Sequence, residues 1–154
     1  MSRIIHFRLI GLLLVSIAGL TGCKTADEAH TGQMASVEIS GHSEREIERA
    51  TATAFRANGF TQTEGLVFEK EGSSWETMNY GGWSTDRVWV RVRANVSPDG
   101  NDLFTLACDA FVVQGHGQRG TENEHKFLFA KRSECKQILD QIKASLDEHP
   151  APTD

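Results

Sequence analysis

The sequence predicts an α+β fold in which an antiparallel sheet of five to six strands is covered by two amphipathic helices. Three observations support this prediction. Apolar and polar residues alternate over 87–96 and 102–114, as in half-buried strands, and apolar residues recur at helical spacing over 43–58 and 133–147. A sheet with one apolar face needs a cover on that face, and these two helices are the segments that can supply it.

The first expected elements are a short strand and a capped helix. Val37-Glu38-Ile39 alternates, and Ser43-Glu44-Arg45-Glu46 then fits a capping box, in which the two end side chains each accept a bond from the other's backbone N–H. Apolar residues follow at helical spacing, and Gly59 stands where a left-handed C-cap is favoured. The sequence therefore predicts a helix over about 43–58.

The middle of the chain predicts strands joined by turns. Candidate strands cover about 61–70 and 74–80, separated by Glu71-Gly72-Ser73 and closed by Gly81-Gly82. The clearest strand, 87–96, and its successor, 102–114, are joined by the turn Pro98-Asp99-Gly100-Asn101. The apolar face of the clearest strand consists of Val88, Val90, Val92, Ala94 and Val96.

The last expected elements are a short strand around Lys126 to Ala130 and a helix over about 133–147 capped by Ser133. The apolar stripe of this helix is Cys135, Ile138, Leu139, Ile142 and Leu146. The order of a strand, a helix, four or five antiparallel strands and a helix resembles the helix-grip and TATA-binding-protein-like folds. This resemblance concerns topology alone and carries no function.

The first 22 residues have the composition of an export signal. Arg3 and Arg8 accompany an apolar run from Leu9 to Leu20, and no acidic residue is present. The run is about a dozen residues long, whereas a permanent membrane helix needs roughly twenty. Its end, Leu20-Thr21-Gly22-Cys23, resembles the lipobox of bacterial lipoproteins.

The lipobox resemblance implies that residues 1–22 are cleaved and that Cys23 is lipidated. In that family a diacylglyceryl group on the cysteine sulfur, usually joined by an acyl group on the amine, anchors the chain in the cell envelope, facing the periplasm. Lys24 in place of an Asp resembles lipoproteins sent to the outer membrane, so we expect the outer rather than the inner membrane. An ordinary signal peptide and an uncleaved signal anchor are the alternatives.

Beyond the signal, the sequence predicts one domain. Residues 23–35 resemble a lipidated tether, 36–148 a single folded α+β domain, and 149–154 a disordered tail. Cleavage removes Arg3 and Arg8 and leaves 14 basic against 21 acidic residues. A net charge of about -7 makes nucleic acid and anionic lipid surfaces poor partners for the domain as a whole.

Two cysteines remain in the domain, and both are predicted to point inward. Cys108 falls on the apolar face of its strand and Cys135 on the apolar stripe of the last helix. In an oxidising periplasm this predicts a disulfide, which stabilises by about 4 kcal/mol on the chain-entropy model. Two unbonded core thiols are the alternative, and a catalytic thiol is not expected because neither cysteine lies in a CxxC motif.

The chain contains no specific catalytic, metal or cofactor motif. No two histidines have the spacing of HxxxH or HExxH, and no serine lies in GxSxG. The segment Gly115-His116-Gly117-Gln118-Arg119-Gly120 could bind an anion, but a strand follows it where a phosphate loop needs a helix. We therefore expect no cofactor and no enzyme, and we keep an envelope enzyme that uses the 115–120 loop as a less favoured alternative.

One face of the sheet carries the candidate binding residues. Alternation with the valines predicts that Trp89, Arg91 and Arg93 project together away from the helices, and Trp and Arg are enriched at interface hot spots. Trp75, Tyr80 and Trp83 could extend this surface. The alternative is that these aromatic residues pack on one another or form a second, minor core.

These features predict a membrane-anchored, non-catalytic envelope lipoprotein that binds or scaffolds a protein or glycan partner. The alternative from another class is a carrier of a small apolar ligand, held between the sheet and the terminal helix. That alternative requires Phe104, Phe111, Phe127 or Phe129 to line a cavity.

Overall fold

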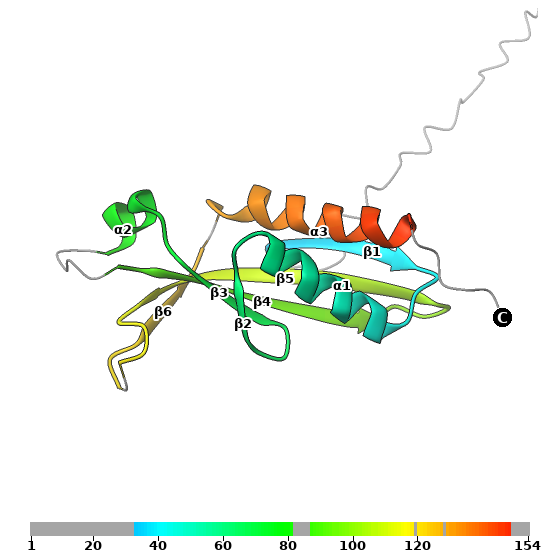
Figure 1. Cartoon of the computed structure of the whole chain (residues 1–154), viewed down its shortest axis with the longest axis horizontal. Coiled ribbons are helices and arrows are strands. Elements are labelled where there is room, and N and C mark those ends of the chain that lie inside the picture. Colours follow the sequence, from blue (N-terminus) through cyan, green and yellow to red (C-terminus); the bar gives the residue numbers. More distant parts are fainter. Residues whose placement is uncertain (1–32, 82–86, 119, 128, 149–154) are drawn as a thin grey trace, which may run out of the picture.

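The computed structural model describes residues 33–81, 87–118, 120–127 and 129–148 (Figure 1). The predicted signal peptide, the lipidation site Cys23 and the tail 149–154 lie outside these residues. The described part contains one six-stranded antiparallel sheet and three helices, so the predicted α+β class is confirmed.

Strand β5 is the centre of the sheet. The strand order is β1-β5-β4-β3-β2, and β6 also pairs with β5. β5 therefore pairs with three strands, and each of these pairings is antiparallel. The strands are β1 (Ala35–Ser40), β2 (Thr61–Glu64), β3 (Val67–Glu71), β4 (Trp89–Pro98), β5 (Leu103–Gln114) and β6 (Asn123–Lys126).

Two long helices, α1 (Glu44–Ala57) and α3 (Arg132–Asp147), lie on the same side of the sheet (Figure 1). α3 covers β1 and β5, and α1 packs beside it over β4 and β2. Between helices and sheet lies the core, in which Phe55 stacks on Phe68 with the ring centroids 4.5 Å apart. Among the described residues, none of the helices has the length and apolar character needed to cross a membrane.

The start of α1 confirms the predicted capping box. The side chain of Ser43 accepts a hydrogen bond from the Glu46 backbone, and the Glu46 carboxylate accepts one from the Ser43 backbone at 2.8 Å. Gly59 follows the C-cap Asn58 with φ +81°, a conformation that favours glycine.

The folded domain begins two residues before the predicted boundary at 36. β1 begins at Ala35, and Met34 is buried in the core. The Met34 backbone N–H donates to Asp109 Oδ1 at 2.9 Å.

The predicted strand over 74–80 is wrong, because this segment forms the helix α2 (Ser74–Tyr80). Ser73 and Glu76 make a second capping box, which supplies bonds to the first turn. The segment has no apolar face to bury as a strand, since its one buried residue is Glu76. The predicted order of strand, helix, remaining strands and terminal helix is kept, with three helices in place of two.

Three other boundaries differ from prediction. Residues 61–70 form two strands, β2 and β3, because the chain turns at Gly65 with φ +48°. α3 begins at Arg132 with Lys131 as an N-cap that makes no side-chain bond, so Ser133 is not the cap. β6 lies at Asn123–Lys126 rather than around 126–130.

Candidate functional site

The candidate site lies on the sheet face turned away from α1 and α3. On β4, Val90 and Val92 are buried beneath the helices, whereas Trp89, Arg91 and Arg93 share the opposite face, as alternation predicts. The register places Arg91 beside Glu69 of β3 on one side and beside Phe111 of β5 on the other. We call this surface the Arg91 face.

Arg91 is the centre of an ion-pair network on this face. Its Nε lies 2.5 Å from Glu69 Oε1, and its Nη1 lies 2.8 Å from Glu122 Oε1 and 2.9 Å from Glu124 Oε2. The side chains of Arg91 and Glu69 are only 15% and 8% exposed. Burial disfavours the guanidinium charge, but the hydrogen bonds to the three carboxylates outweigh it and raise the pKa of Arg91.

His116 folds onto the same network from the glycine-rich loop. Its Nε2 lies 2.9 Å from Glu69 Oε2, and its ring stacks on Trp89 with the centroids 4.1 Å apart and the planes 15° from parallel. Burial alone would raise the pKa of Glu69, but the hydrogen bonds from His116 and Arg91 outweigh burial and lower it. Glu69 is therefore held as a carboxylate beneath the stack.

Arg93 is the more accessible of the two arginines. Its side chain is 48% exposed, its Nη1 lies 2.7 Å from Glu124 Oε1, and its guanidinium lies 4.6 Å from the centre of the Phe111 ring. A guanidinium at that distance over a ring is attracted by the ring's negative face. Arg93 thus presents a charged group that is held over an aromatic side chain.

The three predicted residues therefore share one face of the sheet but differ in their surroundings and exposure. Arg91 is enclosed by carboxylates, Trp89 is half-buried in its stack with His116, and Arg93 is exposed. Sequence reasoning missed Glu69, Glu122 and Glu124 as members of the face. The alternation of Val67, Glu69 and Glu71 signals only that Glu69 shares a strand face with Glu71, and not that it pairs with Arg91.

In its described part, the 115–120 loop makes hydrogen bonds within itself and to the neighbouring Glu122. The Gly117 backbone N–H donates to the Glu122 carboxylate at 3.4 Å, and the Gln118 N–H donates to the Gly115 carbonyl at 3.0 Å. Arg119, which the anion-binding alternative needs, lies outside the described residues. Among the residues that the structure describes, no group of three or more His, Cys, Asp or Glu side chains could hold a metal ion.

Both cysteines of the domain are buried and meet in the core. Cys108 and Cys135 are free thiols in the structure and hydrogen-bond each other. This bond and burial together raise the pKa of the Cys108 thiol, which therefore stays protonated at neutral pH. Their inward positions are those that the sequence predicts, and the disulfide itself stays a prediction.

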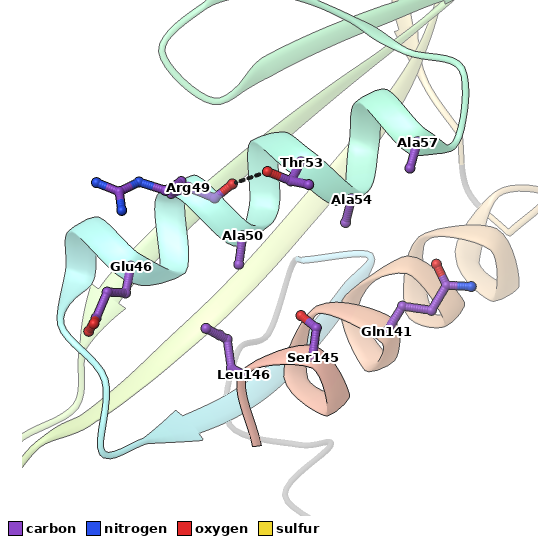
Figure 2. Close-up of a pocket in the computed structure, with 9 residues that line it drawn as sticks. All are labelled: Glu46, Arg49, Ala50, Thr53, Ala54, Ala57, Gln141, Ser145 and Leu146. Carbon is purple, nitrogen blue, oxygen red and sulfur yellow. Dashed lines mark hydrogen bonds between the residues drawn. The ribbon is translucent and has the colours of Figure 1, made fainter. Parts of the chain in front are cut away.

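A groove between α1 and α3 is the second candidate site (Figure 2). Its volume is about 450 Å³, and from Ala50 onward the α1 side chains that line it are small. Glu46 and Arg49 stand at the end near the start of α1, and Leu146 of α3 faces Ala50 across the groove (Figure 2). The remaining lining residues are Thr53, Ala54, Ala57, Gln141 and Ser145.

The phenylalanines that a ligand carrier requires do not surround one space. Phe127 is buried in the core, Phe104 packs partly against it, and Phe129 is exposed. Phe111 lies on the Arg91 face, beneath Arg93. The four rings are therefore divided among the core, the Arg91 face and the exposed surface.

The chain matches no protein-family model, and no curated protein or solved structure matches it.

Proposed function

We propose that the protein is a membrane-anchored, non-catalytic lipoprotein of the cell envelope that binds a protein or glycan partner through the Arg91 face. The observation that carries the proposal is the Trp89–His116 stack on the same sheet face as the exposed Arg93. Aromatic rings and guanidinium groups held in fixed positions are the usual anchors of a binding interface.

The network around Arg91 supports binding by fixing these groups in advance. Glu69 holds His116 and Arg91 at the same time, and Glu124 holds Arg91 and Arg93. A surface whose side chains are already ordered loses less conformational entropy when a partner binds. Aromatic rings and a guanidinium on one face suit a partner that combines an apolar surface with hydrogen-bond acceptors, such as the C–H face and the hydroxyl groups of a sugar.

The same contacts weigh against the enzyme alternative. A general acid or base must reach the proton that it transfers in the substrate. Glu69 is nearly buried and is occupied by Arg91 and His116, and His116 is covered on one side by Trp89. Glu69 and His116 are therefore better placed to hold the side chains of this face in position than to transfer a proton to or from a substrate.

The Trp89→Ala substitution tests the binding face. We expect it to weaken partner binding by about 2 kcal/mol, the scale of an interface hot spot, and to change stability far less. Quantitative pull-down of envelope partners measures the first effect, and a denaturant melt measures the second. If Trp89 instead anchors a second core, the melt should show a loss of roughly 3 to 5 kcal/mol, which contradicts the proposal. A stable Trp89→Ala protein that keeps every partner contradicts it as well.

The Cys23→Ala substitution tests the anchor. We expect an unlipidated protein, which retains residues 1–22 if only the lipoprotein signal peptidase can process it. Detergent partitioning and mass spectrometry of the N-terminus measure both effects. An unmodified Cys23 in the wild-type protein would falsify lipidation, and recovery of the lipidated protein from inner-membrane fractions would contradict the expected outer-membrane address.

A further inference from the structure

One end of the molecule exposes three large apolar side chains, Trp75, Met78 and Phe129, which we call the apolar tip. Their exposed fractions are 52%, 76% and 77%. Trp75 and Met78 lie on α2, and Phe129 lies in the connection between β6 and α3. Tyr80 joins the two parts, since its ring lies 6.1 Å from that of Trp75 and 5.1 Å from that of Phe127.

The apolar tip is held in place by a buried ion pair. Glu76, the one buried residue of α2, pairs with Lys131 at the start of α3, and Lys131 also lies 2.6 Å from Glu134. Burial opposes ionisation of Glu76, but the hydrogen bonds from Lys131 and Ser73 outweigh it and lower its pKa to about 2. α2 is therefore fastened to the base of α3, and its exposed positions, Ser74, Trp75, Met78 and Asn79, carry no charge.

Charge is distributed unequally between the two ends of the molecule. In Figure 1, α2 and the start of α3 lie at one end, and the β4–β5 turn, the start of α1 and the end of α3 lie at the other. Near the apolar tip, Arg132 is exposed next to Phe129 and has no ion-pair partner among the residues described. The far end carries the exposed carboxylates Glu44, Glu48, Asp99, Asp102, Asp147 and Glu148, which outnumber the cations Arg45, Arg49 and Lys143 there.

Because the charges are separated in this way, the net negative charge of the domain does not oppose membrane contact at the apolar tip. An anionic lipid surface repels the far end, where the carboxylates lie, but it does not repel the uncharged α2 surface. The exposed Arg132 is attracted to lipid phosphates. The net negative charge therefore disfavours contact between the bilayer and the domain as a whole. It favours an orientation in which the apolar tip faces the bilayer.

The chain enters the fold about halfway along β5, at Asp109. The Met34 backbone donates to the Asp109 side chain, and the neighbouring Ala110 carbonyl accepts a bond from the Phe127 backbone at 2.9 Å. The 11 residues from Cys23 to Gln33 connect the predicted lipid to this point. At up to about 3.6 Å per residue they span at most about 40 Å, so the bilayer lies within reach of the apolar tip.

We propose that the apolar tip lies in the headgroup region of the bilayer that holds the lipid on Cys23. The inference rests on the proposed lipid anchor. Tryptophan prefers the boundary between headgroups and acyl chains, and apolar side chains combined with a nearby arginine bind such a surface. The anchor keeps the apolar tip at high effective concentration near the membrane, so a small apolar contact is enough to orient the domain.

Tryptophan quenching in vesicles tests this orientation. The lipidated full-length mature protein is reconstituted in vesicles of phosphatidylethanolamine and phosphatidylglycerol whose acyl chains carry bromine, a fluorescence quencher. The Trp83→Phe/Trp89→Phe protein reports on Trp75 alone, and the matched Trp75→Phe/Trp83→Phe protein reports on Trp89 alone. We expect brominated lipid to reduce the Trp75 emission and shift it to shorter wavelength, and to leave the Trp89 emission unchanged.

A charge-matched pair of variants separates membrane contact from folding. Met78→Asp/Phe129→Asp places two charges in the apolar tip at exposed positions and should abolish quenching of Trp75 without loss of stability. Gln137→Asp/Ala144→Asp places two charges on the exposed side of α3 and should leave the quenching unchanged.

Flotation of the same vesicles distinguishes a failure of the lipid anchor from a failure of the proposed orientation. If the protein does not float, the lipid anchor is contradicted and the orientation falls with it. If the protein floats and Trp75 is not quenched, the anchor stands and the orientation is overturned. That second result is also the one expected if the apolar tip binds another protein instead of lipid.

Discussion

Replacement of Arg91 by Ala is expected to lower the free energy of unfolding by about 3 to 5 kcal/mol, the cost of leaving a buried charge without its partner. Glu69, whose side chain is 8% exposed, would keep only His116, and Glu122 and Glu124 would lose their shared cation. Denaturant unfolding of the unlipidated Cys23→Ala protein, with and without Arg91→Ala, measures the difference.

Two variants control for this loss. Arg93 is half-exposed and pairs only with Glu124 among the described carboxylates, so Arg93→Ala should cost at most about 1 kcal/mol. Glu69→Leu together with Arg91→Met removes both buried charges and should recover most of the stability lost by Arg91→Ala. If Arg91→Ala costs no more than Arg93→Ala, the network does not fix this face.

The pH dependence of stability provides a second readout of the same substitution. The pKa of Glu69 is lower in the folded state than in the unfolded one, where it is about 4.3. The stability that the ionised carboxylate contributes is therefore present above that pH and is lost as the pH falls toward the folded pKa. Because Arg91 is one cause of the lowered pKa, the Arg91→Ala protein should lose less stability over this acidic range than the wild-type protein does.

Reduction of a Cys108–Cys135 disulfide is expected to lower the free energy of unfolding by about 4 kcal/mol, because the open chain regains the entropy that the closed loop lacks. Both thiols are buried in the core and hydrogen-bond each other, so the two side chains that would form the bond are neighbours. Urea melts of periplasmically expressed protein, with and without reductant, measure the effect, and non-reducing peptide mapping identifies the bond.

The Cys108→Ala/Cys135→Ala protein is the control, since its stability should not respond to reductant. Two free thiols, titrated in the wild-type protein after denaturation without reductant, would show that the cysteines are unbonded core residues.

Long periodic segments could be predicted because their pattern fits only one structure. In β4 and β5 the alternation extends over ten and twelve residues, and a helix would scatter those valines around its surface. The segment 74–80 is too short for its period to decide between strand and helix. Ser73 and Glu76 did carry the deciding signal, a capping box, as Ser43 and Glu46 did for α1.

The candidate site could be predicted only in part, because a sequence period describes one strand and not the partners that other segments supply. Alternation along β4 determines that Trp89, Arg91 and Arg93 share a face. Their partners come from other segments, namely Glu69 from β3 and Glu124 from β6, and these meet Arg91 through strand register. The position of His116 depends on how the loop after β5 folds, and no period in the sequence specifies that.

The pairing of β1 and β6 with β5 has a mechanical consequence for an anchored protein. β1 occupies the edge of β5 from Leu103 to Cys108 and β6 the same edge from Phe111 to Gln114, so two separate strands lie end to end along it. β1 is also the first strand after the predicted tether, so tension on the lipid would act on its pairing with β5 before it acts on any other pair of strands. A pull strong enough to peel β1 away would expose the edge from Leu103 to Cys108, and an exposed strand edge can pair with another chain.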